Sequence, residues 1–289
     1  MKTFDTSGNV SLTSDGIEGA TATAFKFNTS STYSTDGANL LRLSNNNTNV
    51  FDFSWQGGID HVNSGATTAA HSQSLNLNWV GTATQTSRGQ YSVVMGANND
   101  ALGTHSIAVG SANQATGNYC GAFGESNQVN APHSFIVGMQ GKTDNRITFC
   151  IGGNAFANAG DCQVLTAALK AATTNATQTT MLAQSTNYVI PADTTWAFSA
   201  LVVARSDEAD GNLSAVWRLE GCLARDESSS TVIVGSVTKT VIADGAAAAW
   251  DITATADDTN EALAIQVTGE AATNIRWVAK VDISQVTYA

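Results

Sequence analysis

Hydrophobic and polar positions alternate in two different ways along the chain. Between residues 89 and 140, apolar runs about four residues long recur every fourteen residues, and a glycine and then an asparagine follow them. From residue 178 onward the alternation extends over longer stretches, as in 213–225 and 274–283. Because a period of two is typical of β-strands, both regions are predicted to be β-structure, with almost no helix signal.

The fourteen-residue pattern holds through four successive units. They are GQYSVVMGANNDAL from Gly89, GTHSIAVGSANQAT from Gly103, GNYCGAFGESNQVN from Gly117 and APHSFIVGMQ from Ala131. A short apolar strand, a glycine and an asparagine-containing corner make one coil of a β-solenoid, in which Gly and Asn supply left-handed corner conformations. The residues predicted to carry this structural repeat are Gly89, Gly96, Asn99, Gly103, Gly110, Asn113, Gly117, Gly124, Asn127 and Gly138.

A ring occupies the third place of every unit, in Tyr91, His105, Tyr119 and His133. One interpretation is functional: the column grips a sugar, or a histidine on a threefold axis binds an ion. The other is a stacked structural edge of the solenoid. The structural interpretation is favoured because packing fills a repeat position first.

The solenoid region has few ionic groups. Asp100 and Glu125 are the only charged residues between 89 and 140. A coil of fourteen residues encloses little core by itself, so burial against identical neighbours is the simplest way to complete it. The uncharged faces are therefore expected to contact other copies of the chain.

The string THSIAVGSANQATGNYCGAFG, residues 104–124, resembles the head repeat of trimeric autotransporter adhesins, which also occurs in bacteriophage fibre proteins. The resemblance implies a trimeric left-handed parallel β-roll, and hence a homotrimer. Departures from the family pattern at Cys120, Gly121, Ala131 and Pro132 predict that the roll ends there. An autotransporter also needs a signal peptide and a C-terminal membrane barrel, and neither is expected here, so the bacteriophage branch is favoured.

The C-terminal region is predicted to be a jelly-roll-like antiparallel β-sandwich with about seven strands. The run at 196–205 is apolar on both faces, as in a central strand. Further strands are expected at 231–243, 250–256 and 261–269. The stretch from Ile190 to Ala279 resembles the C-terminal knob domain of phage tail-fibre proteins, which implies a knob at the end of a fibre.

Four parts are predicted along the chain. They are an N-terminal attachment segment at 1–80 with short strands at 24–27, 39–43 and 50–55, a β-roll shaft at 81–140, a neck at 141–177 and a knob at 178–289. Within the neck, the brief apolar run at 163–172 fits either a helix or a strand.

Composition and charge exclude several classes of protein. Of 289 residues, 43% are hydrophobic and 13% charged, which predicts a folded chain. A net charge of −11 has the wrong sign for binding nucleic acid or an anionic membrane. No window approaches 18 consecutive apolar residues and the start lacks the apolar core of a signal peptide, so we expect no membrane insertion and synthesis in a host cytoplasm.

Motifs of common enzymes and cofactor sites are missing from the sequence. The GKT at 141–143 lacks the first glycine of a phosphate loop, because Ile136 stands in its place, and no GxSxG, HExxH or GxGxxG occurs. The cysteines have no zinc-like spacing and are expected to be small buried residues. We therefore predict no catalytic residue, no metal, no cofactor and a protein that is not an enzyme. The four cysteines are Cys120, Cys150, Cys162 and Cys222.

Two features of the C-terminal region allow a binding interpretation. Asp207 and Asp210 lie in one acidic turn, and oxygen ligands of this kind hold calcium, but a solvated acidic hairpin is favoured because the alternating ligand series is incomplete. Trp250, at a loop–strand junction, is the tryptophan with the strongest case for an exposed carbohydrate platform. Trp217 and Trp277 fall on apolar strand faces and are expected in the core.

These features predict a structural virion protein of a bacteriophage, a trimeric tail fibre or tail-associated adhesin on the virion surface. Its N-terminal segment is expected to bind other tail or capsid proteins, and its knob a host surface glycan or protein. The alternative is a capsid decoration protein, of cement or head-fibre type, at threefold or pseudo-threefold capsid positions, which the short chain suits. A spike that cleaves polysaccharide is less favoured.

Overall fold

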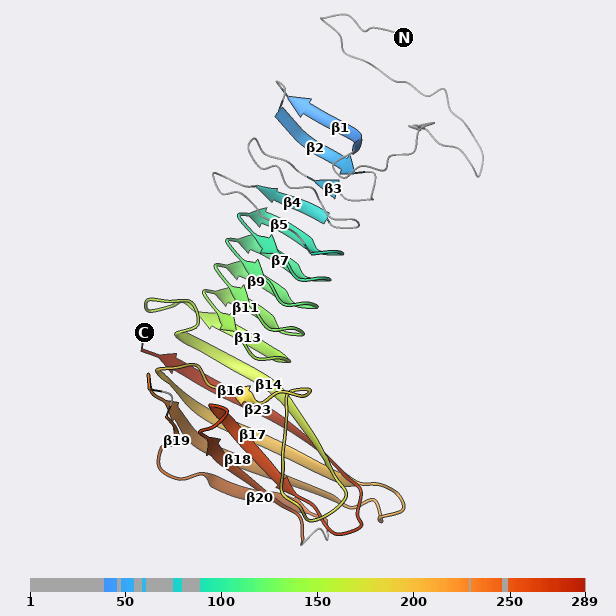
Figure 1. Cartoon of the computed structure of the whole chain (residues 1–289), viewed down its shortest axis with the longest axis vertical. Helices are drawn as coiled ribbons and strands as arrows, with labels where there is room; N and C mark the ends of the chain where they lie inside the picture. Colours follow the sequence, from blue (N-terminus) through green and yellow to red (C-terminus); the bar gives the residue numbers. More distant parts are fainter. Residues whose placement is uncertain are drawn as a thin grey trace, which may run out of the picture. The chain divides into compact units, whose positions relative to one another are not determined.

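Every element in the computed structural model is a β-strand (Figure 1). The structure describes residues 39–45, 48–54, 59–60, 75–79, 89–228, 230–245 and 249–288. All of them belong to one unit, Gly37–Ala289, while the other unit of the chain, Met1–Asp36, lies outside the described residues. In these ranges there is no helix, and so none long and apolar enough to cross a membrane. The predicted all-β class is confirmed.

Four strands precede the repeat region. They are β1 (Asn39–Asn45), β2 (Thr48–Ser54), β3 (Ile59–Asp60) and β4 (Leu75–Trp79). Strands β1, β2 and β3 pair antiparallel, and β4 pairs in parallel with both β3 and the first strand of the repeat. The short strands predicted at 39–43 and 50–55 lie in β1 and β2, and the one at 24–27 lies outside the described residues.

The repeat region is a parallel β-solenoid of about four turns. One sheet pairs residues fourteen apart, as Val94 with Ala108, and a second sheet of two-residue strands completes each coil. The strands of the first sheet are β5 (Val93–Ala97), β7 (Ile107–Ser111), β9 (Gly121–Glu125), β11 (Phe135–Met139) and β13 (Thr148–Gly153). Those of the second are β6 (Asp100–Ala101), β8 (Gln114–Ala115), β10 (Gln128–Val129) and β12 (Lys142–Thr143).

Small side chains fill the interior of the coils. The sixth and thirteenth places of the repeat point inward from the two sheets, and the fourth place adds a small polar group or a thiol. Because a coil of fourteen residues leaves little space, only small or slender side chains fit. The buried residues at these places are Val94, Ala108, Ala122, Ile136 and Cys150, then Ala101, Ala115, Val129 and Thr143, then Ser92, Ser106, Cys120, Ser134 and Thr148.

A buried asparagine ladder runs along the solenoid at the eleventh place. Asn113 Nδ2 donates to the carbonyl oxygens of Val109 at 3.0 Å and Gly124 at 2.7 Å, and its Oδ1 accepts from the backbone amide of Asn127 at 3.2 Å. Asn99 donates in the same way. None of the three has a positive φ, so the prediction that these asparagines supply the left-handed corners is wrong. Their amides instead satisfy backbone groups at the corner.

Three other places make the left-handed corners. At the eighth place, φ lies between 105° and 120°, and a Cβ on Gly110 would overlap the carbonyl oxygen of Gly124, so only glycine fits. The third and tenth places are the other two corners, with φ between 53° and 67°. The third-place residues are Tyr91, His105, Tyr119, His133 and Ile147, and the tenth-place residues are Asn98, Ala112, Ser126, Gln140 and Asn154.

The first place of the repeat is not a left-handed corner and needs glycine for a different reason. A Cβ on Gly103 would overlap the carbonyl oxygen of Gly117 in the next coil.

The parallel ladder does not end at Ala131 and Pro132, where departures from the repeat predicted its end. β13 pairs in parallel with β11, so the register continues beyond these residues. Cys120 also preserves the coil, because its Sγ donates to the carbonyl of Gly117 at 2.8 Å as Ser106 Oγ does to Gly103. The coil depends on its corner conformations, which recur regardless of these substitutions.

Two antiparallel sheets form the C-terminal region. The first continues from β13 in the order β14 (Cys162–Thr173), β23 (Ile275–Thr287), β17 (Thr194–Ser206) and β18 (Ser214–Arg225), and β18 also pairs with β19 (Thr231–Ile233) and β20 (Thr238–Asp244). The second contains β15 (Thr179–Thr180), β16 (Tyr188–Val189), β21 (Asp251–Asp257) and β22 (Ala262–Thr268). The run at 163–172 is therefore strand.

One apolar core joins the two antiparallel sheets. The ring of Trp277 on β23 lies 5.8 Å from that of Trp217 on β18 and 5.8 Å from that of Trp250, which precedes β21. The first two are buried as predicted. Trp250 is only 4% exposed, which excludes the carbohydrate-platform interpretation: the loop–strand junction turns it inward against Trp277.

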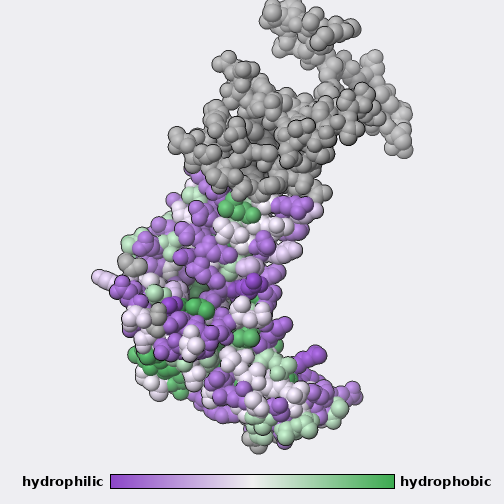
Figure 2. Space-filling model, in the orientation of Figure 1, coloured by the Kyte–Doolittle hydropathy of each residue, from purple (hydrophilic) through white to green (hydrophobic). Residues whose placement is uncertain are grey.

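The outer face of the first antiparallel sheet is open. Val203 on β17 and Val278 on β23 are direct partners on that face and are 44% and 56% exposed. β17 is central, as its two apolar faces predicted, yet the described chain covers only one of them. Figure 2 shows hydrophobic surface gathered toward β19, where Val232 and Val234 are exposed.

The division of the chain into four parts at residues 80, 140 and 177 stays a prediction.

Candidate functional site

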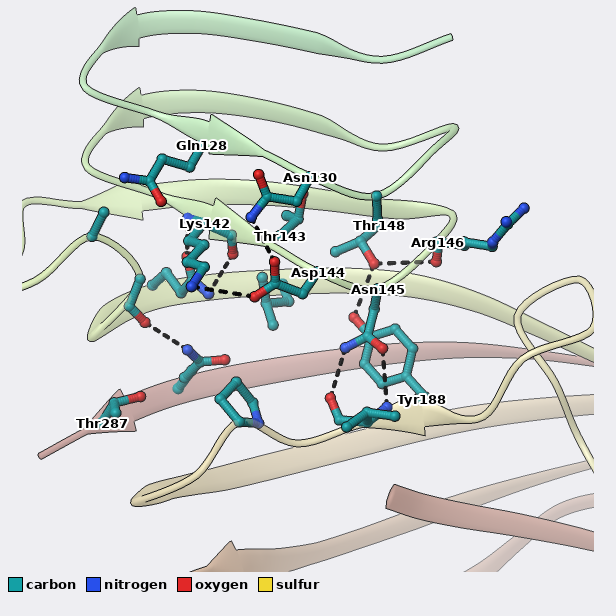
Figure 3. Close-up of a pocket in the computed structure, with 18 of the residues that line it drawn as sticks. Gln128, Asn130, Lys142, Thr143, Asp144, Asn145, Arg146, Thr148, Tyr188 and Thr287 are labelled. Carbon is teal, nitrogen blue, oxygen red and sulfur yellow. Dashed lines mark hydrogen bonds and ion pairs between the residues drawn. The ribbon is translucent and has the colours of Figure 1, made fainter. Parts of the chain in front are cut away.

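A cavity of about 850 Å³ lies between the last coil of the solenoid and the C-terminal sheets (Figure 3). Its walls come from four stretches of the chain, 128–148, 158–165, 186–196 and 285–287. The volume is that of a small-molecule site. Strand β14 brings these stretches together, because it pairs with the end of the solenoid on one side and with β23 on the other.

Asn145 forms one wall by linking the solenoid to the segment that contains β16. Its Nδ2 donates to the Val189 carbonyl at 2.7 Å, and its Oδ1 accepts from the Val189 amide at 3.0 Å. Nearby, the hydroxyls of Thr148 and Tyr188 lie 3.1 Å apart. Burial raises the pKa of Tyr188, so the phenol stays neutral and keeps this bond.

Two glutamines fix the opposite side of the cavity through both ends of their amides. Gln163 accepts from the Lys142 amide at 2.8 Å and donates to the Lys142 carbonyl at 2.9 Å. Gln285 accepts from Nε1 of Trp196 at 2.9 Å and donates to the Gly160 carbonyl at 2.5 Å. These side-chain amides hold the wall together, and few of their hydrogen-bond donors and acceptors remain for a ligand.

Asp161 holds the loop at the cavity's edge. Its carboxylate accepts from the backbone amides of Phe156, Ala157 and Asn158 at 2.7 to 2.9 Å. Burial by itself would raise the pKa of Asp161, but the amide donors outweigh burial and lower it. The carboxylate is therefore a fixed structural anion.

The other charges of the cavity are two cations and one carboxylate, which bring its lining to two charges of each sign. Lys142 Nζ lies 3.6 Å from Oδ2 of Asp144, and Asn130 Nδ2 donates to Oδ1 of Asp144 at 2.7 Å. Figure 3 shows Lys142 and Asp144 pointing toward each other, whereas Arg146 extends away from them. Arg146 donates to the side chain of Gln184 at 3.0 Å. The cavity thus has no concentration of positive charge.

Several polar groups of the lining have no protein partner. Thr143 is 2% exposed, and its hydroxyl has no hydrogen-bond partner within the described residues. The side chains of Gln128, Asn158 and Asn187 also line the cavity without a recorded hydrogen bond in that part of the chain. The Thr143 hydroxyl is enclosed within the coil, whereas the three amides are half-buried or exposed and can donate to or accept from a ligand or water.

None of the ten residues predicted for the repeat lines the cavity. They lie in the coils, the glycines at corners and close approaches and the asparagines in the buried ladder. The sequence nevertheless contained one signal for the cavity. Thr143 stands at the thirteenth place of the repeat, where Ala101, Ala115 and Val129 are apolar, so a hydroxyl replaces a core side chain next to the cavity.

The ring column at the third place is a continuous stack. Centroids lie 4.6 Å apart for Tyr91 and His105, 4.9 Å for His105 and Tyr119, and 5.2 Å for Tyr119 and His133. Both faces of the two inner rings are covered by neighbouring rings. A sugar stacks on an open aromatic face, so this geometry favours the structural interpretation of the column.

The acidic turn of the C-terminal region is held by hydrogen bonds. Asp207 accepts from the Asp210 amide at 2.9 Å, and Asn274 donates its amide to Asp210 at 2.7 Å and its side chain to Asp207 at 3.1 Å. Across the described ranges, no group of three or more His, Cys, Asp or Glu side chains is arranged to hold a metal. The turn joins the β17–β18 and β22–β23 connections.

The cysteines are free thiols. Cys120 and Cys150 are buried as expected, and burial raises the pKa of Cys120 to about 11 and that of Cys150 to about 12. Both are therefore unreactive thiols at neutral pH. Cys162 and Cys222 are half-buried, which differs from the expected full burial because each lies on the outward side of its strand.

Comparison with known proteins finds two similar phage structures. One is the tailspike protein gp49 of Acinetobacter baumannii bacteriophage Fri1, named as a capsular polysaccharide depolymerase, with 9% identity over 78% of this chain and 49% of that one, and a TM-score of 0.30. The other is the tailspike of Acinetobacter phage vB_ApiP_P1, with 11% identity, 75% and 54% coverage, and a TM-score of 0.23. The chain thus spans about half the length of each tailspike.

No protein-family model matches the chain, and no curated protein is similar to it. The prediction that the chain is not an enzyme is contradicted by the Fri1 comparison, because a depolymerase is an enzyme. That prediction is therefore wrong and is not kept.

Proposed function

We propose that this chain is a structural protein of a bacteriophage virion, a homotrimeric tail fibre or tail-associated protein that attaches the particle to a bacterial surface. The observation that carries the proposal is the open apolar face of the solenoid sheet. Phe149 and Ile151 on this face are 43% and 49% exposed. Monomeric proteins seldom leave such surface uncovered, so it marks an interface. Other exposed members are Met95, Ile107 and Phe135.

The same face continues onto the C-terminal region. Ile151 on β13 is the register partner of Val164 on β14, which is also exposed. Further across the sheet, Val278 and Val203 are partners on that side. Identical copies that meet along the solenoid would therefore cover apolar surface from β5 to β17. Three copies is the number that the repeat at 104–124 implies by its resemblance to trimeric fibre proteins.

In this assembly, residues 1–80 anchor the fibre to other virion proteins and residues 178–289 face the host. The segments at 81–140 and 141–177 form the shaft and neck between them. The surface bound by the C-terminal region is a glycan or a protein of the host.

The test is electron microscopy of virions labelled with gold-conjugated antibody against residues 178–289, combined with a cell-attachment assay of the isolated protein. Label at the tail and saturable attachment are expected. Label over the head would replace the tail assignment by capsid decoration, and unlabelled particles would overturn the proposal. Release of reducing ends from host polysaccharide, measured in the same assay, decides whether attachment is accompanied by cleavage.

A further inference from the structure

We propose that the cavity between the solenoid and the C-terminal sheets binds a neutral saccharide unit. This inference rests on the proposed attachment function and names both the site and the chemistry of its ligand. The cavity holds about 850 Å³, which admits a sugar residue and part of its neighbour.

The lining offers the mixture of donors and acceptors that sugar hydroxyls require. Each hydroxyl both donates and accepts, so a site for several of them needs amides, carboxylates and hydroxyls close together. Gln128, Asn158 and Asn187 have side-chain amides that make no hydrogen bond within the described chain. Asp144 adds carboxylate lone pairs beyond those that its two neighbours use.

Charge in the cavity argues against an anionic ligand. A phosphate or carboxylate would need a cation directed at it, but Lys142 faces Asp144, and Arg146 extends away from this pair and donates to Gln184. Asp161 adds an anion that is already saturated by backbone amides. A neutral ligand is therefore favoured over a nucleotide, a phosphosugar or a uronate.

Apolar patches in the wall suit the carbon–hydrogen faces of a sugar ring. Pro132 and Pro191 line the cavity from the solenoid and from the C-terminal region, together with Val189. None of the residues that form the open apolar face of the solenoid lines the cavity. Trimer formation through that face would leave the cavity residues outside the interface.

The experiment measures binding of the full chain to an array of bacterial surface oligosaccharides with neutral, uronate-bearing and phosphate-bearing members. The wild type is expected to bind neutral members. Asp144→Ala should weaken that binding at least tenfold, because it removes two acceptors and leaves Lys142 without its partner. Glu227→Ala is the matched control, since Glu227 is an exposed carboxylate in the turn between β18 and β19, outside the cavity and the solenoid face, and it should bind as the wild type does.

A second variant, Ala159→Trp, fills the cavity without removing a polar group, and its thermal unfolding is measured to confirm that it folds. Loss of neutral-glycan binding in this folded variant is expected. Equal binding by the wild type and both cavity variants would place the site elsewhere. Binding of anionic members alone would overturn the neutral chemistry. If the protein attaches to cells but binds no member of the array, the cavity proposal is overturned and the proposed function stands.

Discussion

Asn145 and Val189 bind each other through a pair of hydrogen bonds, in which one side-chain amide completes both backbone groups of a residue 44 positions away. This is the pattern by which β-strands pair, with a side chain in place of one strand. It joins the last coil of the solenoid to the segment of β16 and closes one wall of the cavity.

Asn145→Ala is expected to loosen this wall. The change removes both hydrogen bonds of Val189 at an exposed position, where water can replace them, so a loss of about 1 kcal/mol of unfolding free energy is expected. Hydrogen exchange should become faster at the Val189 amide while the β17 and β18 amides keep their protection. Asn187→Ala alters a cavity side chain that makes no hydrogen bond within the described residues, and it should leave exchange at Val189 unchanged. Equal effects of the two variants would show that the Asn145 bonds are unimportant.

Gly110→Ala should destabilise the solenoid far more than Gly235→Ala. Both glycines have positive φ, 120° and 80°, so alanine is strained at either site. A Cβ on Gly110 would also overlap the carbonyl oxygen of Gly124, whereas a Cβ on Gly235 meets nothing within 4 Å. Urea unfolding should therefore place Gly110→Ala more than about 2 kcal/mol below the control. Similar losses of unfolding free energy for the two variants would mean that the close approach of Gly110 to Gly124 in the next coil adds little to stability.

Asn113→Ala tests the buried ladder. The substitution leaves the carbonyls of Val109 and Gly124 and the amide of Asn127 without a side-chain partner, so a loss of more than about 3 kcal/mol is expected. Asn118→Ala removes an exposed amide that accepts a bond from the Thr104 amide at 2.9 Å, and about 1 kcal/mol or less is expected. Urea denaturation of the two variants measures the difference, and a small loss at Asn113 would contradict the ladder's role.

The stability contributed by Asp161 should depend on pH. Its pKa is lowered in the folded protein, so its contribution is present above about pH 4, the ordinary value for aspartate, and is lost as the pH falls through the lowered pKa. Asp161→Asn should therefore unfold at lower urea than the wild type at pH 7, and the gap should close toward acid pH. Glu227→Gln, at an exposed carboxylate, serves as control. A gap that persists unchanged at low pH would contradict this assignment.

The solenoid was predictable from sequence because its constraint is periodic. The glycine at the eighth place recurs wherever a Cβ would strike the next coil, and alternation in 213–225 and 274–283 reflects strands with one buried face. The role of the asparagines was missed, because periodicity reports that a residue is needed and gives no information on which backbone groups its side chain satisfies.

The sequence signals the cavity only at Thr143, and its place and walls were not predictable. Its walls combine stretches far apart in the chain, as when Gln285 bonds to Gly160 and Asn145 to Val189. These partners become neighbours only through the pairing of β14 with both β13 and β23. The buried position of Trp250 has the same origin, since its partner Trp277 belongs to the facing sheet.

The central claim is that the open face of the solenoid is an interface between copies, and the native mass of the chain tests it most directly. Native mass spectrometry of the wild type should give three times the 29.9 kDa chain mass. Ile151→Asp, which places a charge on that face, should give monomer that keeps its β-structure by circular dichroism. A wild-type chain that is monomeric at micromolar concentration would contradict the account.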